Sequence, residues 1–168
     1  SIHPLFGPSA ESLDGMSVAV VHPKRLYGRA REIVQNLRGS GARIVRCTPE
    51  LHDRAISYTL ALPHLLGGNY ASSLLRSGLR PRTLAMLGGT SFRMMYSLAR
   101  SVGSESPTVY ASIQLAHHSY PRALGRALST LRGVQRELSS GETRAFLRLL
   151  DAASNLASAE GIDGGKWF

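Results

Sequence analysis

The spacing of apolar residues changes between strand-like and helix-like along the first 48 positions. Residues 16–22 form a β-branched run that predicts a buried strand, and residues 42–46 predict a second strand. Between these strands, apolar residues recur every three or four positions over 26–37, which predicts a helix that ends at the glycines after it. The pattern predicts a βαβ unit with two parallel strands. Because two strands do not make a stable sheet alone, we expect residues 1–48 to be the end of a larger α/β domain.

From Thr48 onward the pattern predicts helices only. Thr48-Pro49-Glu50 is a typical helix start, with a capping side chain, a proline at the first helical position and an acid in the first turn. Further helices are predicted over 80–102 with a break at the two glycines 88 and 89, and over 107–119, 121–139 and 142–160, before a glycine-rich tail at 161–168. The predicted fold class is therefore mostly α, an all-helical domain over 49–168 preceded by the βαβ segment.

The stretch from Ala55 to Leu75 contains no charged side chain and is long enough to cross a bilayer. It also contains Pro63, His64 and two glycines, so we interpret it as a buried core helix and expect no membrane contact. Together with the leucine stripes of the last two predicted helices, it offers more apolar surface than one small bundle hides. We therefore expect a homodimer.

The net charge of +9 comes almost entirely from arginine, because only two of the 20 basic residues are lysine. The arginines are scattered and have no aromatic interleaving, so we expect no nucleic-acid binding, and a small polyanion explains the same charge. The single cysteine, Cys47, excludes an internal disulfide and a cysteine metal cluster and favours the cytoplasm. No signal peptide opens the chain, which begins without methionine, so we expect the natural start to lie elsewhere.

Histidines dominate the candidate chemistry. The opening segment, Ser1 to Pro8, contains His3, two prolines and a glycine, so we expect a stiff loop and no regular structure there. A turn whose histidine caps a backbone group stays an alternative. His52 and His64, twelve residues apart, fall about 120° out of register on one predicted helix, and a bend at the intervening proline would bring them closer. No spacing resembles a metal motif, so none is predicted.

Two histidine pairs have simpler explanations. His52-Asp53 could be a helix-start pair that the helix dipole favours, and His117-His118 falls at a predicted helix end where cations are stabilised, so we assign it no role.

Four motifs in order resemble the prephenate dehydrogenase family. His3-Pro4-Leu5-Phe6-Gly7 is similar to its His-Pro-Met-Phe/Ala-Gly loop, and Glu50-Leu51-His52-Asp53 with His64 is similar to its acidic-x-His-Asp element and later histidine. The helix carrying Arg93 and Arg100, followed by Pro107-Thr108-Val109-Tyr110-Ala111, resembles its next two segments. The chain departs from the family at Pro8-Ser9, where a Thr or Asp and often a Glu are usual, at Ser112, where an acid is usual, and in having no G-x-G-x-x-G fingerprint.

The resemblance implies an enzyme that oxidatively decarboxylates prephenate or arogenate with NAD or NADP. It implies that His3 is the catalytic histidine on the ring hydroxyl, that Arg100 binds the ring carboxylate, and that His64 faces the side-chain end, where tyrosine inhibits some members. Further candidates are Arg93 and His52 for the substrate, and Pro4 and Gly7 for the cofactor.

The resemblance also implies that residues 1–48 end a Rossmann-type nucleotide-binding domain and carry the catalytic loop, and that residues 49–168 form the substrate-binding and dimerisation domain. The cofactor would then bind mainly to a part not present here, and we expect this chain alone to be inactive. Two alternatives stay open. One is a non-catalytic helical dimer that binds an aromatic amino acid. The other is the helical domain of a β-hydroxy acid dehydrogenase, which would need a lysine over 50–75, where there is none.

Overall fold

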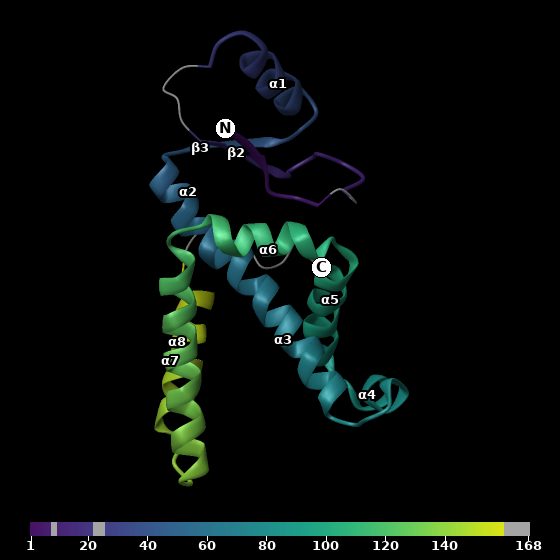
Figure 1. Ribbon diagram of the computed structural model, residues 1–168, viewed down its shortest axis with the longest axis vertical. Helices are drawn as coiled ribbons and strands as arrows, with labels where there is room; N and C mark the ends of the chain where they lie inside the picture. The colour runs from purple at the N-terminus through teal and green to yellow at the C-terminus, as the bar shows by residue number, and fades with distance from the viewer. Residues whose placement is uncertain (8–9, 22–25, 160–168) are drawn as a thin grey trace. The chain divides into compact units, whose positions relative to one another are not determined.

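The structure is a computed structural model that describes residues 1–7, 10–21 and 26–159 (Figure 1). The end of the first predicted strand, His22, and the predicted tail at 161–168 lie outside the described residues. Contacts divide the chain into two compact units, residues 1–120 and 121–168, and each is described by itself. The proposed domain boundary after residue 48 stays a prediction.

The elements in chain order are β1 (Ile2–Pro4), β2 (Ser17–Val21), α1 (Gly28–Gly39), β3 (Arg43–Cys47), α2 (Pro49–Ile56), the π-helix η1 (Ser57–Ala61), α3 (Leu62–Arg76), α4 (Pro81–Leu87), α5 (Thr90–Ser104), α6 (Pro107–Ala116), α7 (Tyr120–Ser139) and α8 (Arg144–Ala157).

The described residues form a mostly helical protein preceded by a small sheet of order β1-β2-β3. β2 and β3 are parallel, with Val18 opposite Ile44, and α1 connects them. β2 is the central strand, and its residues 18–21 are between 0% and 7% exposed. The predicted βαβ unit and its buried first strand are confirmed.

The expectation of a loop without regular structure around His3 was wrong. Ile2–Pro4 forms the edge strand β1, which pairs antiparallel with β2 and places His3 opposite Ala19. Pro4 is tolerated because it is the last residue of an edge strand, where its missing N–H breaks no pairing. The pairing continues on both sides, since Leu5 donates to the Ser17 carbonyl at 2.9 Å and Val21 donates to the Ser1 carbonyl at 2.9 Å. The strand holds His3 in a defined position.

The long helix that begins after Thr48 contains an irregularity that the sequence pattern did not predict. The predicted N-cap is present, with the Leu51 N–H donating to Thr48 Oγ1 at 3.2 Å. At Ser57 the α-helix widens into the π-helix η1, which closes with the Leu62 N–H on the Ser57 carbonyl. Pro63 follows at once, and a proline in a regular helix would meet the carbonyl four residues earlier, so the wider turn relieves that clash.

The remaining helices in residues 1–120 largely follow the prediction. The expected break after Leu87 is confirmed, because Gly89 caps a new helix, α5. α3 and α5 approach each other closely at Gly67, which is buried. α6 ends at Ala116, three residues before the predicted end, so His117 lies at its C-cap.

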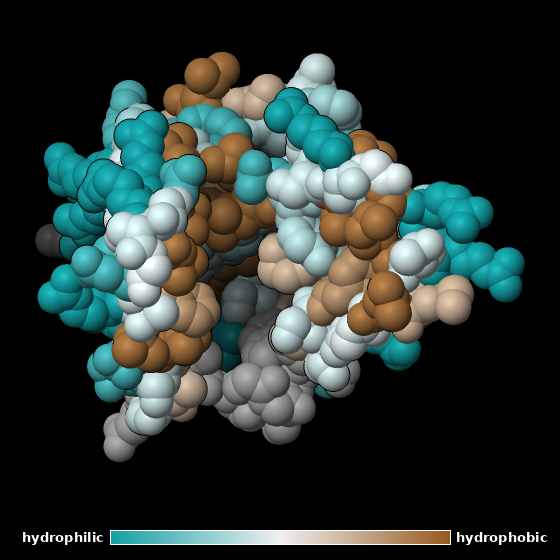
Figure 2. All heavy atoms as spheres, turned by 90° about the horizontal axis from the view of Figure 1, so that it is seen from below, coloured by the Kyte–Doolittle hydropathy of each residue, from teal (hydrophilic) through white to brown (hydrophobic). Residues whose placement is uncertain are grey.

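Much apolar surface stays open in this single chain. The uncharged stretch was expected to be a buried core helix, yet Leu65 and Leu66 are 39% and 38% exposed and Leu75 is 84% exposed. In the second unit, Leu131 and Leu150 of the predicted stripes are each 49% exposed. Figure 2 shows hydrophobic side chains open to solvent on the face it draws. No helix among the described residues is long and apolar enough to span a membrane.

Candidate active site

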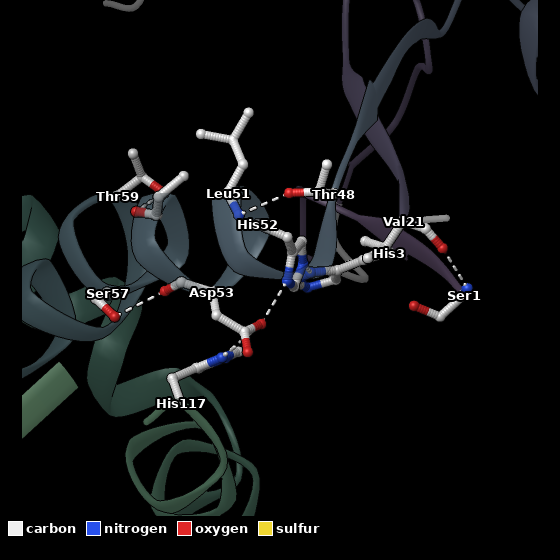
Figure 3. Close-up of polar contacts among 11 residues, drawn as sticks. Ser1, His3, Val21, Thr48, Leu51, His52, Asp53, Ser57, Thr59 and His117 are labelled. Carbon is white, nitrogen blue, oxygen red and sulfur yellow. Dashed lines mark hydrogen bonds and ion pairs between the residues drawn. The ribbon is translucent and has the colours of Figure 1, made fainter. Parts of the chain in front are cut away.

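Two histidines that lie 49 residues apart in the sequence meet in the structure. β1 presents the His3 side chain to the first turns of α2, where Nδ1 of His3 lies 2.9 Å from Nε2 of His52 (Figure 3). Their rings meet edge to face, with centroids 5.2 Å apart. Nδ1 of His52 in turn lies 2.9 Å from Oδ1 of Asp53. A continuous chain of hydrogen bonds therefore runs from Asp53 through His52 to His3.

The order of donors along this chain follows from the carboxylate. An ionised Asp53 only accepts hydrogen bonds, so His52 must carry its proton on Nδ1. A neutral His52 then has an unprotonated Nε2, which accepts from the protonated Nδ1 of His3. In the neutral ring of His3, Nε2 is left with a free lone pair. The geometry therefore prepares His3 to accept a proton at Nε2.

The surroundings keep the two ends of the chain in the required charge states. Burial is the largest cause that lowers the pKa of His3, and the nearby His52 and His117 lower it further. The hydrogen bond from His52 is the largest cause that lowers the pKa of Asp53. At neutral pH, His3 is therefore a neutral base and Asp53 a carboxylate.

His117 belongs to this site, although the sequence analysis assigned it no role. Its Nδ1 lies 3.5 Å from Oδ1 of Asp53, the same oxygen that His52 contacts (Figure 3). That distance is within ion-pair range, but the atom makes no hydrogen bond of good geometry. The ring centroids of His117 and His52 are 6.0 Å apart. His117 is the C-cap residue of α6, directly after the last helical residue, Ala116.

His64 lies in a second group of side chains, with residues from α6. Its ring meets that of Tyr110 edge to face, with centroids 4.2 Å apart, and its Nδ1 is buried without a hydrogen-bond partner among the described residues. One turn further along α6, Gln114 donates from Nε2 to the Ala61 carbonyl at 3.0 Å. Burial is the largest cause that lowers the pKa of His64. Because each residue of η1 turns the helix by less than the 100° of an α-helix, the π-turn reduces the offset expected between His52 and His64.

The two candidate arginines line a cavity of about 930 Å³ among α3, α4 and α5. Arg93 and Arg100 share it with Arg82 and with the stacked rings of Phe92 and Tyr96, whose centroids are 5.7 Å apart. None of the histidines named above lines this cavity. The structure therefore places both arginines at one cavity and His3 beside His52, and it shows no contact between these two groups among the described residues.

The candidate cofactor contacts, Pro4 and Gly7, are exposed at the edge of the sheet. The described residues contain no phosphate cradle beside them, so they do not by themselves fit a dinucleotide. No group of three or more potential ligands in the described part of the chain is arranged to hold a metal ion.

Comparison with known proteins relates the chain to one family. The family described as "Prephenate dehydrogenase, dimerization domain" matches residues 48–152. The probable arogenate/prephenate dehydrogenase of Methanocaldococcus jannaschii is 19% identical over 98% of this chain and 37% of its own length.

Solved structures show the same fold. A putative prephenate dehydrogenase from Corynebacterium glutamicum is 17% identical and has a TM-score of 0.71, with 94% of this chain and 54% of that chain covered. Prephenate dehydrogenase from A. aeolicus in complex with hydroxyphenyl propionate and NAD+ is 16% identical and has a TM-score of 0.55, with 86% and 51% covered. The chain thus spans less than two thirds of the length of these relatives. Because the family's dimerization domain matches more than half of its residues, the chain belongs to the prephenate dehydrogenase family.

Proposed function

We propose that the protein takes part in the oxidative decarboxylation of prephenate or arogenate, with NAD or NADP as oxidant. The observation that carries this proposal is the chain Asp53–His52–His3, which leaves Nε2 of His3 free to accept a proton. The family membership and the A. aeolicus relative, bound to NAD+ and a hydroxyphenyl acid, support it.

The proposed reaction needs a base at the position of His3. A bound nicotinamide cofactor would supply the acceptor for the hydride that leaves the ring carbon bearing the hydroxyl. As the carbonyl forms, the hydroxyl proton passes to Nε2 of His3, which burial keeps neutral. Loss of carbon dioxide then makes the ring aromatic.

Arg100 would orient the bond that breaks. A guanidinium matches the two oxygens of a carboxylate, so we assign the ring carboxylate to Arg100, with Arg93 beside it in the same cavity. His64 and Tyr110 would face the side-chain end of the substrate, where tyrosine would also bind as an inhibitor. His52 would act on the substrate mainly through its hydrogen bond to His3.

The cofactor would be held mainly by residues other than those described here, with Pro4 and Gly7 at its edge. We also infer a homodimer, which the matched dimerization domain supports, and a cytoplasmic location, which the single cysteine supports.

Replacement of His3 tests the proposal, in a protein that joins this region to its cofactor domain. His3→Asn keeps a polar side chain of similar reach and removes the proton acceptor, so kcat should fall about 100-fold or more with little change in KM. His118→Asn, an exposed neighbour of the site, is the control and should keep full activity. Steady-state NAD(P)H formation from prephenate and arogenate measures both. If His3→Asn oxidises either substrate at the wild-type rate, His3 is not the base.

A further inference from the structure

When His3 accepts a proton, its ring becomes positively charged, and the residues around the ring disfavour that charge. The ring is half-buried, and two imidazoles nearby lower its affinity for a proton. The proposed reaction delivers a proton to Nε2 in every turnover, so the site needs a route that moves the resulting charge elsewhere. This argument rests on the proposed function.

The hydrogen bonds behind His3 supply such a route. As the substrate O–H bond breaks and an N–H bond forms at Nε2 of His3, the proton on Nδ1 of His3 can pass to Nε2 of His52, 2.9 Å away. The positive charge then lies on His52, whose Nδ1 already donates to the Asp53 carboxylate at 2.9 Å. His3 returns to the neutral form, and the numbers of protons and bonds balance.

Asp53 makes His52 a better site than His3 for the positive charge. An imidazolium on His52 faces a carboxylate directly, whereas an imidazolium on His3 faces a second ring. The Asp53 side chain, which faces this charge, is 36% exposed, while that of His52 is 12% exposed.

His117 also lies beside the carboxylate, within ion-pair range but without a hydrogen bond of good geometry. Its Nδ1, at 3.5 Å, approaches the same oxygen as His52, and its side chain is 12% exposed. Two titratable groups thus face Asp53 from different elements, His52 on α2 and His117 after α6. Both imidazoles therefore approach the same oxygen, Oδ1 of Asp53.

We propose that Asp53, steadied by His117, is a positioning residue that sets the tautomers of His52 and His3 and so makes the pair a proton relay. Neither residue touches the substrate in this scheme; both act through His52.

The tautomers can be read without any catalytic reaction. We expect ¹⁵N NMR of the histidine rings, at a pH of about 7.5, to show Nδ1–H forms for both His3 and His52 in the 168-residue chain. Asp53→Ala removes the acceptor and should return His52 to a mixture of tautomers. His117→Ala should give a smaller change in the tautomers of His52 than Asp53→Ala does. His118→Ala, the matched control, should leave the tautomer of His52 unchanged. An Nε2–H form of His52 in the unsubstituted chain, or tautomers that ignore Asp53→Ala, would overturn the proposal.

Kinetics in the protein with its cofactor domain supply the second readout. Asp53→Ala should lower kcat by about 10- to 1000-fold at unchanged KM. It should also move the acidic limb of the kcat/KM profile to lower pH, since the protonated histidine pair then lacks the carboxylate that faces its positive charge. A fall in kcat without movement of that limb would make Asp53 merely structural. Failure of the proposed function is distinguishable, because the wild-type protein would then not oxidise prephenate or arogenate while the NMR result could still hold.

Discussion

At the scale of single residues, the buried histidines couple the stability of the protein to pH. Burial is the largest cause that lowers the pKa of both His3 and His64 from 6.5. Below that pH the unfolded chain binds more protons than the folded chain at these two positions, so protonation favours unfolding. Their contribution to the free energy of unfolding is therefore fully retained above pH 6.5 and is lost as the pH falls through the lowered folded pKa values.

Denaturant unfolding between about pH 7.5 and pH 5 measures this coupling. We expect the free energy of unfolding to decrease towards acid pH, and to decrease less in a variant that carries both His3→Asn and His64→Asn, which removes the two groups. The variant His118→Asn should keep the wild-type dependence. Equal slopes in all three proteins would mean that neither buried histidine controls the acid stability.

The two arginines of the cavity should differ in their effect on substrate binding. If Arg100 anchors the ring carboxylate, Arg100→Ala should lower kcat/KM by roughly 30- to 1000-fold, because a charge-assisted bidentate pair is lost. Arg100→Lys should recover only part of this, since an ammonium keeps the charge without the fork. Arg93→Ala is the matched variant, because the same cavity contains it. A larger loss with Arg93→Ala would transfer the role of anchor to Arg93.

At the scale of elements, the packing of α3 on α5 depends on a glycine. A Cβ atom added to Gly67 would lie 3.1 Å from side-chain carbons of both Leu98 and Val102, whereas one added to Gly68 would meet nothing within 4 Å. Both glycines lie inside α3, so alanine improves helix propensity by about 1 kcal/mol at either position. Only at Gly67 must α5 or its side chains move to admit the methyl group.

This pair of neighbours gives a test in which the two substitutions have opposite signs. Gly68→Ala should raise the free energy of unfolding by up to about 1 kcal/mol. Gly67→Ala should lower it by about 1–3 kcal/mol, the usual cost of an overpacked interface. Thermal or denaturant unfolding of both variants measures the difference. Equal stabilisation by the two alanines would show that α3 and α5 are not in close contact at Gly67.

At the scale of the whole molecule, the exposed apolar surface predicts association. Large hydrophobic side chains on both units stay open to solvent, among them Leu75, Leu131 and Leu150. Obligate homodimers bury interfaces of this composition, and the matched family domain is described as a dimerization domain. We expect sedimentation at micromolar concentration to give a species of about twice 18.1 kDa. A stable monomer that does not associate would contradict this expectation.

The sequence by itself determined most of the elements, because helices and strands follow from local spacing and local capping. The start after Thr48, the break at the paired glycines and the parallel βαβ unit were all predicted from neighbouring residues. Motifs in register with a known family also pointed to His3, His52 and His64 as candidates, and their roles stay predictions. Local signals misled where a partner from elsewhere changed the outcome, as when pairing with β2 made an edge strand of the segment around His3.

Only the tertiary structure decided which of these residues lie together. His3 and His52 are 49 positions apart and Asp53 and His117 are 64 apart, and no local pattern encodes a contact over such distances. The pairing of β1 with β2, the π-turn before Pro63 and the early end of α6 place these side chains. The pairing of β1 with β2 depends on a contact between distant segments, whose energy a periodicity along the chain does not contain. For that reason the order of proton donors, from His3 to Asp53, could be derived only from the folded molecule.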